Sequence, residues 1–261
     1  MTGQVQLVGA GPGDAGLLTL RGLRALERAD VIVADRLGAR AVLDGLAADG
    51  VTLRAEVIDV GKLPGHHAVP QDAINALLVA RARAGARVVR LKGGDPYVFG
   101  RGGEELAYCR EHGIDAEIIS GVTSAVAVPA LAGVPLTHRG VATAFTVVTA
   151  HDQIVELGGG REHTVVLMMG IGTLAHSAHV LACGRRGADC PVAIVEDGFG
   201  HRQRVTVGTL STIAAQAAVR GVRSPAVVVV GDVVALSPYA PAELAAQVAP
   251  TEPSLIRKAV P

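Results

Sequence analysis

The stretch VVRLKGGDPYVFGRGGEE, residues 88–105, decides the fold class of this chain. Val88–Leu91 is an apolar, β-branched run that predicts a buried strand, and a helix is expected from about Gly103 until Gly113 stops it. Between them the chain is dense in glycine, which lets the backbone approach a ligand closely, and Asp95 adds a carboxylate. This order is typical of an α/β protein that binds ligands beyond the carboxyl ends of its strands. Gly-Asp-Pro also occurs in ordinary turns, but a segment with so many glycines and charged residues favours a binding site.

Short apolar strands alternate with helical patterns on both sides of this stretch. A helix is expected between Pro70, which suits a first helical turn, and Gly85, which suits the position after a helix end. Near-continuous apolar runs predict strands covered on both faces of a sheet. The expected strands are Val5–Val8, Val31–Ala34, Glu56–Val60, Val88–Leu91, Ala116–Ile119, Thr146–Thr149, Val165–Met168, Val192–Val195 and Ala226–Val230.

Two glycines and a proline interrupt any regular element over residues 133–140, so a linker is expected there. We therefore predict an N-terminal α/β domain over residues 1–137 and a C-terminal α/β domain over 138–237. Residues 238–261 are expected to form a flexible tail. The cleft between two such domains is the expected place for a ligand.

Composition excludes several classes of protein. Of 261 residues, 49% are hydrophobic and 18% charged, which is typical of a packed globular enzyme. The formal net charge is zero and aromatic residues make up 2%, so neither a basic field nor a stacking platform for nucleic acid is expected. No apolar run is long enough to span a membrane. Three isolated cysteines and the lack of a signal-peptide pattern predict a cytoplasmic protein.

The segment Gly9–Asp14, GAGPGD, invites comparison with a dinucleotide-binding turn. That fingerprint, G-x-G-x-x-G, requires glycine where this chain has Asp14, and Pro12 removes one backbone N–H from the loop. A carboxylate there would also repel a pyrophosphate. A tight turn between strand and helix explains the motif equally well.

Ionisable residues gather in the expected loops. Asp35 and Lys62 each end an expected strand, where ligands usually bind in α/β sheets. Adjacent His66 and His67 have no thiol or carboxylate to complete a zinc pattern, so no metal is predicted. Each basic residue in such loops, taken alone, is typical of a solvated surface. Taken as a set, these residues predict a basic rim that binds a ligand with several carboxylates. The set is Arg36, Arg40, Lys62, His66, His67, Arg101, His138 and Arg139.

Taken together, these segments resemble the uroporphyrinogen-III C-methyltransferases of the tetrapyrrole methylase superfamily. The resemblance runs from about Val5 to Leu236. It is carried by VGAGPGD, ADRL, DVGKLPGHHAVPQ, VVRLKGGDPYVFGRGGEE, SGVTSAVAVPALAGVPLTHRG and the VEDG, GTL and SPAVVVVGDVV segments. The GK-x-PG, FGRGGEE and PLTHRG segments are the more particular to these enzymes.

The resemblance implies two α/β domains with S-adenosylmethionine in the cleft between them, and a homodimer. The reaction it implies is methylation of uroporphyrinogen III at C2 and C7, which gives precorrin-2 by way of precorrin-1 and releases S-adenosylhomocysteine. The implied proton acceptor and donor are Asp35 and Lys62, and substrate contacts are expected at Arg36, Arg101, His138 and Arg139. The implied cofactor contacts are Pro12, Gly93, Gly94, Asp95, Val98, Thr123, Ser124, Met169 and Gly198.

Three alternatives remain open at this point. The nearest is another precorrin C-methyltransferase. A nicotinamide-dependent oxidoreductase is disfavoured by Pro12 and Asp14. A non-catalytic tetrapyrrole-binding protein is supported only by Ala34 and Met168, since the family commonly has tyrosine at both positions.

Overall fold

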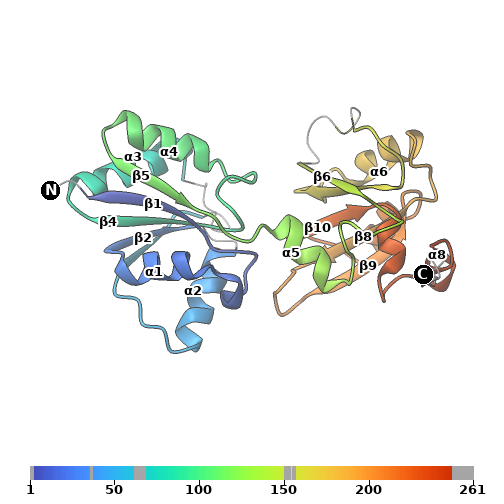
Figure 1. Ribbon diagram of the computed structural model, residues 1–261, viewed down its shortest axis with the longest axis horizontal. Helices are drawn as coiled ribbons and strands as arrows, with labels where there is room; N and C mark the ends of the chain where they lie inside the picture. Colours follow the sequence, from blue (N-terminus) through green and yellow to red (C-terminus); the bar gives the residue numbers. More distant parts are fainter. Residues whose placement is uncertain (1–2, 36–37, 62–68, 150–153, 155–156, 249–261) are drawn as a thin grey trace, which may run out of the picture. The chain divides into compact units, whose positions relative to one another are not determined.

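The computed structural model describes residues 3–35, 38–61, 69–149, 154 and 157–248. The chain forms two compact units, residues 1–127 and 128–261, and the division falls inside helix α5 (Ser124–Leu131). Each unit is built on one five-stranded sheet with helices (Figure 1). The expected α/β class with two α/β domains is thereby confirmed. The expected domain limits at residues 137 and 237 stay predictions.

The first unit contains a fully parallel sheet in the order β3-β2-β4-β1-β5. Parallel strands place their carboxyl ends at one edge, so the loops that follow them meet there. In Figure 1, α3 and α4 cover one face of this sheet and α1 and α2 the other. The strands are β1 (Gln4–Gly9), β2 (Val31–Ala34), β3 (Glu56–Asp59), β4 (Arg87–Lys92) and β5 (Asp115–Ile119); the helices are α1 (Leu20–Arg28), α2 (Ala39–Ala48), α3 (Gln71–Arg83), α4 (Gly102–Glu111) and the short η1 (Ala15–Leu17).

The central strands β2 and β4 of this sheet are buried on both faces, as their apolar residues predict, whereas the edge strand β3 is largely exposed. Val31 and Val33 belong to the core beneath α3 and α4, whereas Ile32 and Ala34 belong to the core beneath α1 and α2. This alternation is the two-residue period of a strand. Each fully buried aliphatic side chain of this size contributes about 1.5–3 kcal/mol, so the two layers together hold the sheet.

The helix expected between Pro70 and Gly85 is α3. Pro70 is its N-cap, and Gly85 follows the helix with a φ of 92°, a conformation that glycine adopts without strain. Ile74 and Leu78 are buried on its inner face. The sequence prediction is correct here because capping residues and apolar spacing agree.

The second unit contains a mixed sheet in the order β6-β7-β10-β8-β9. Strands β7 and β8 both run antiparallel to β10, so they are parallel to each other and end at the same edge. Helices α6 and α7 contribute Leu181 and Ile213 to the core. The elements are β6 (Ala144–Thr149), β7 (His163–Met168), α6 (Leu174–Cys183), β8 (Pro191–Glu196), β9 (Arg204–Thr209), α7 (Ile213–Val219), β10 (Ala226–Val230), η3 (Asp232–Leu236) and α8 (Ala242–Ala245).

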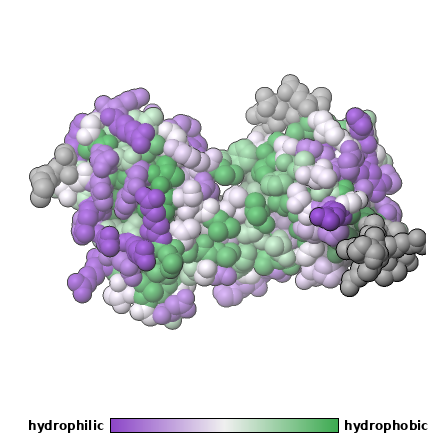
Figure 2. Space-filling view, in the orientation of Figure 1, coloured by the Kyte–Doolittle hydropathy of each residue, from purple (hydrophilic) through white to green (hydrophobic). Residues whose placement is uncertain are grey.

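Two elements differ from the sequence prediction. Helix α5 contains Pro129, and the prediction had no helix there. Ala125 and Val128 of this helix are buried, whereas Val126 is 46% exposed, and Figure 2 shows hydrophobic residues over α5. Strand β9 was also missed. Near the C-terminus, the Ser237 hydroxyl donates to the Ala132 carbonyl at 2.5 Å and Leu244 of α8 is buried, while the expected flexibility of residues 238–261 stays a prediction.

Among the described residues, no helix is long and apolar enough to cross a membrane.

Candidate active site

The loops after β1 and β4 are hydrogen-bonded to each other. Gly11 N–H donates to the Gly94 carbonyl at 3.1 Å, and Gly94 N–H donates back to the Gly11 carbonyl at 2.7 Å. Both glycines have positive φ, 80° and 68°. This pair of bonds brings Pro12 and Gly93, two expected cofactor contacts, into adjoining loops.

The loop after β5 packs against the same pair. A Cβ added at Gly121 would collide with the Gly94 carbonyl oxygen, and one at Gly9 would lie 2.6 Å from that oxygen. Glycine is therefore required where these three strands end. The Thr123 Cα lies 3.8 Å from the position that a Cβ on Gly94 would take, which places the expected contacts Thr123 and Ser124 beside Gly94.

Asp95 ties two of these loops together. One carboxylate oxygen accepts the Tyr97 N–H at 2.8 Å, and the other accepts the Gly121 N–H at 3.0 Å. Each oxygen has further lone pairs that can accept from a ligand hydroxyl or amine. Asp95 therefore both shapes the edge and offers an acceptor to a ligand.

The loop after β2 completes the edge. A Cβ on Gly38 would lie 3.5 Å from the Gly11 carbonyl oxygen and 3.5 Å from the Gly93 Cα. Asp14, by contrast, caps η1, since its carboxylate accepts the Gly16 N–H at 2.8 Å. Loops after β1, β2, β4 and β5 thus converge, as expected from parallel topology, on an edge lined largely by glycine backbone.

Directly below this edge lies a buried charge cluster of Asp35, Arg90, Lys92 and Glu105. The Arg90 guanidinium donates to Asp35 Oδ1 at 2.6 Å and to Glu105 Oε1 at 3.1 Å. Lys92 Nζ lies 3.0 Å from Glu105 Oε1 and 3.9 Å from Asp35 Oδ2. The side chains of Arg90 and Glu105 are 2% and 0% exposed, while that of Asp35 is 34% exposed. Two cations and two anions are therefore balanced, and only Asp35 reaches the surface.

Burial lowers the pKa of one cation of this cluster, Lys92. Desolvation lowers the pKa of Lys92, the positive charge of Arg90 lowers it further, and Glu105 and Asp35 partly oppose both effects. Gln71 also donates to Glu105 Oε1 at 3.0 Å, whereas Glu105 Oε2 is buried without a hydrogen-bond partner among the described residues. The sequence prediction did not include Arg90, Lys92 and Glu105 in the site. The available signal was three cations in a strand whose other residues are apolar.

Five of the described non-glycine residues have positive φ, and all five lie at the expected site segments. Such a conformation is uncommon for non-glycine residues and, at bulky ones, costs about 1–3 kcal/mol, so it tends to cluster at functional sites. Two of the five lie between the expected contact Val98 and the start of α4. The other three are Met169 itself and the two neighbours of Gly198. They are Phe99, Arg101, Met169, Asp197 and Phe199, with φ between 47° and 66°.

Arg101, an expected substrate contact, precedes α4. Its guanidinium binds the Glu104 carboxylate at 2.6 Å, and the two side chains are 55% and 56% exposed. This pairing lowers the pKa of the Glu104 carboxyl. Arg101 is accessible, but a substrate carboxylate would have to compete with Glu104 for it.

In the second unit, Met169 and Gly198 follow β7 and β8, which end at the same edge of the sheet. Met169 is 52% exposed, and a Cβ on Gly198 would lie 2.8 Å from the Val128 side chain. Asp197 stabilises the turn that follows, because its carboxylate accepts the Arg202 N–H at 3.0 Å. The sequence-expected cofactor contacts of this unit therefore share one edge.

The expected basic rim is only partly described. Arg36, Lys62, His66 and His67 lie outside the described residues. His138 and Arg139 are exposed in a turn closed by the His138 N–H bond to the Ala142 carbonyl at 2.8 Å. Arg40 was expected in a loop, and this expectation is wrong: it lies in α2, where it pairs with Asp44 at 3.1 Å. A helical ion pair one turn apart explains its position.

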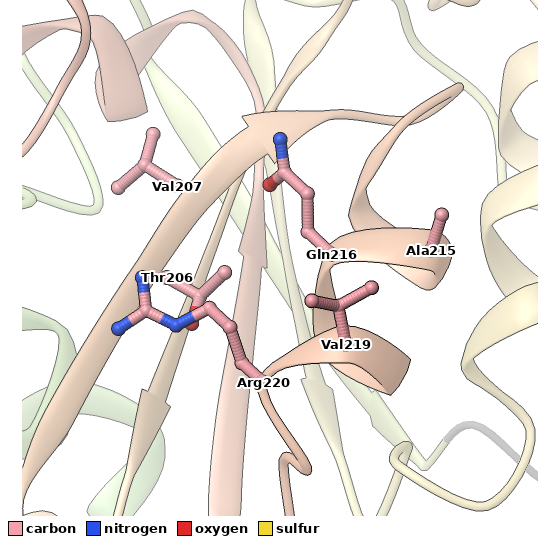
Figure 3. Close-up of a pocket in the computed structure, with 6 residues that line it drawn as sticks. All are labelled: Thr206, Val207, Ala215, Gln216, Val219 and Arg220. Carbon is pink, nitrogen blue, oxygen red and sulfur yellow. The ribbon is translucent and has the colours of Figure 1, made fainter.

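The described residues contain no group of three or more histidine, cysteine, aspartate or glutamate side chains that could hold a metal ion. A hollow of about 400 Å³ lies between β9 and α7 of the second unit (Figure 3). Thr206, Gln216 and Arg220 line it, and no expected site residue does. It is therefore separate from the site considered above.

Comparison with known proteins agrees with this geometry. The sequence model of the tetrapyrrole (corrin/porphyrin) methylase family matches residues 4–214. The chain belongs to this family. The uroporphyrinogen-III C-methyltransferase of Methanocaldococcus jannaschii is 47% identical over 241 residues, which cover 90% of this chain and 98% of that protein.

Solved structures of the family have the same fold. A uroporphyrin-III C-methyltransferase from Thermus thermophilus aligns with a TM-score of 0.74 at 41% identity and covers 90% of this chain and 95% of its own. Another structure of a uroporphyrin-III C-methyltransferase from Thermus thermophilus, complexed with S-adenosylhomocysteine, aligns with a TM-score of 0.73 at 37% identity. That alignment covers 89% of this family member and 93% of the other chain.

Proposed function

We propose that this protein methylates uroporphyrinogen III at C2 and C7, with S-adenosylmethionine as the methyl donor, and gives precorrin-2 by way of precorrin-1. The observation that carries the proposal is the convergence of the GAGPGD, GGDP and SGVTS loops at one sheet edge, directly above the Asp35 cluster. Similarity to the Methanocaldococcus jannaschii enzyme supports the substrate.

S-adenosylmethionine fits the residues present. The edge is lined by glycine backbone at positions where added side chains would collide, which leaves a narrow surface for close approach. Asp95 offers acceptor oxygens for ribose hydroxyls or the amino group, and Pro12, Gly93, Gly94, Val98, Thr123 and Ser124 would lie around it. Met169 and Gly198 are the proposed contacts of the second unit. When bound, the donor supplies an electrophilic sulfonium methyl group.

The residues of the chain would act mainly by positioning. A pyrrole carbon of the reduced macrocycle is already nucleophilic, so alignment provides most of the rate increase. A proton must then leave the macrocycle, and the half-exposed carboxylate of Asp35 is the proposed acceptor. Lys62 is proposed to hold a substrate carboxylate rather than to donate a proton.

The carboxylates of the macrocycle require basic side chains at the substrate site. Arg36, Arg101, His138 and Arg139 are the proposed substrate contacts, and each exposed ion pair would contribute about 0.2–1 kcal/mol, so several must act together. We further propose that the protein is a cytoplasmic homodimer that binds neither nucleic acid nor membrane.

Anaerobic turnover tests this function. The protein is incubated with reduced uroporphyrinogen III and methyl-labelled S-adenosylmethionine, and the products are read by mass spectrometry. Two labelled methyl groups per macrocycle are expected, with one-methyl product appearing first. Label absent from uroporphyrinogen III but present on a methylated precorrin would assign a later-acting precorrin methylase instead. Reduction of a nicotinamide cofactor without methyl transfer would reject the methyltransferase.

A further inference from the structure

Residues that precede and follow the GGDP loop contact each other and so close the loop. Arg90 and Lys92 end β4, and Glu105 in the first turns of α4 accepts from both, at 3.1 and 3.0 Å. Gly102 N–H also donates to the Pro96 carbonyl at 2.9 Å. The strand, the glycine-rich loop and the helix are therefore fastened together beneath the sheet edge.

One hydrogen bond leads from this closure to Asp35 at the sheet edge. The Arg90 guanidinium, 2% exposed, donates to Oδ1 of Asp35, which follows β2, while the Asp35 side chain remains 34% exposed. The guanidinium has its other donors on Glu105 and, at 3.3 and 3.4 Å, on the Val33 and Leu91 carbonyls. Asp35 Oδ2 is 3.9 Å from Lys92 Nζ, beyond hydrogen-bond distance. One oxygen of Asp35 is thus held by a hydrogen bond, and the other accepts none from the described residues.

Stability alone does not account for this arrangement. Buried ion pairs return little net stability, since desolvation of both charges offsets their attraction, and apolar side chains of similar volume often serve the fold equally well. The Glu105 carboxylate would be a sufficient partner for a single buried cation, either Arg90 or Lys92. The cluster instead contains a second cation and extends a rigid, planar guanidinium to the one carboxylate at the sheet edge.

We infer that Arg90 is a positioning residue, which orients the Asp35 carboxylate so that Oδ2 faces the substrate, while Glu105 balances the buried positive charge. This inference rests on the proposed methyl transfer and deepens it. Because the Arg90 side chain is only 2% exposed, its effect on turnover would pass through Asp35.

The chain provides a matched control at the other end of the same two strands. Arg87 begins β4 and pairs with Asp30, which precedes β2, at 2.8 Å. This is again an arginine–aspartate pair between β4 and β2, but it lies at the amino edge of the sheet, away from the converging loops. This pair is more exposed, at 51% and 46%, so Arg87→Lys reports the effect of changing an arginine–aspartate pair between these strands away from the site.

A double-mutant cycle tests the inference. Kinetics of product formation from uroporphyrinogen III are measured for wild type, Arg90→Lys, Arg90→Met, Asp35→Asn, the double variants and Arg87→Lys. Thermal unfolding and calorimetric binding of S-adenosylhomocysteine identify the folded variants. We expect Arg90 variants to lose about tenfold or more in kcat, with S-adenosylhomocysteine affinity and the KM for uroporphyrinogen III within about twofold of wild type. In the Asp35→Asn background, replacing Arg90 should cost nothing further.

Additive losses in the double variants, or Arg90 variants as active as Arg87→Lys, would overturn the inference. So would failure of both Arg90 variants to fold, because Arg90 would then be a requirement of the fold. Wild-type turnover in the same assay separates the two proposals. No wild-type methylation rejects the proposed function and this inference with it, whereas normal methylation with additive losses rejects only the role of Arg90.

Discussion

Asp95 and Gly121 are joined by a 3.0 Å hydrogen bond from the Gly121 N–H to the Asp95 carboxylate, which connects the loop after β4 to the loop after β5. The same carboxylate holds the Tyr97 N–H at 2.8 Å. The GGDP motif therefore provides more than a ligand contact. It fastens the glycine-lined edge on which the methyl donor is proposed to bind.

Asp95→Ala should weaken binding of S-adenosylhomocysteine by more than tenfold. Loss of charge-assisted hydrogen bonds of this kind costs about 1.5–3 kcal/mol each. Calorimetry measures the affinity, and Asp30→Ala is the control, since Asp30 also accepts a backbone N–H, from Arg87 at 2.8 Å, at the opposite edge of the sheet. Unchanged affinity in a folded Asp95→Ala protein would remove Asp95 from the site.

Asp35 and Lys62 should differ in their kinetic effects. Because Asp35 is proposed to accept a proton, Asp35→Ala should lower kcat by about 10²-fold with little change in KM. Lys62→Ala should mainly raise the KM for uroporphyrinogen III. Steady-state kinetics with reduced substrate measure both. A normal KM with a collapsed kcat in Lys62→Ala would contradict the anchoring role and assign Lys62 to proton transfer.

The charge cluster illustrates what sequence reasoning could and could not find. The apolar, β-branched run Val88–Leu91 correctly predicts β4, and cations within such a strand indicate that buried partners must exist. The partners themselves depend on topology: Glu105 comes from the next helix, and Asp35 follows a strand placed beside β4 only by the order of the sheet. Local patterns carry no such information.

Backbone conformation was also beyond the sequence analysis. Met169 and Phe199 adopt positive φ although neither residue type favours it, so tertiary contacts must impose these conformations. Helix α5 was missed although it directly precedes the expected linker, and its Pro129 removes only one N–H from this short apolar helix. Arg40 was misplaced because loop and helix were not distinguished around Gly38.

The three cysteines should react very differently. Burial raises the pKa of Cys109 to about 11 and that of Cys190 to about 12, whereas Cys183 is exposed. Thiolates are the reactive form, so alkylation of the native protein near pH 8 should modify Cys183 alone. Raising the pH towards 11 should increase labelling of Cys109 before that of Cys190. Mass spectrometry after iodoacetamide treatment reads this, with denatured protein as the control; rapid native labelling of Cys190 at pH 8 would show that it is not buried.

The proposed homodimer has a direct solution test. The chain has a mass of 26.5 kDa, so sedimentation at micromolar concentration should give a species of twice that mass. The same mass should persist at moderate salt concentration, since stable homodimer interfaces are largely apolar. A 26.5 kDa species across the concentration range would show that the protein is a monomer.

The central claim is carbon methylation of uroporphyrinogen III at two positions, and the position of the transferred methyl groups tests it most directly. The macrocycle is methylated anaerobically with ¹³C-methyl S-adenosylmethionine and examined by NMR. If the protein methylates C2 and C7, the product carries two labelled methyl groups, each bonded to a ring carbon at one of these positions. A singly labelled precursor is expected at early times. Label on nitrogen, on carboxylate oxygen or on other ring carbons, or a reaction that stops after a single methyl group, would contradict the central claim.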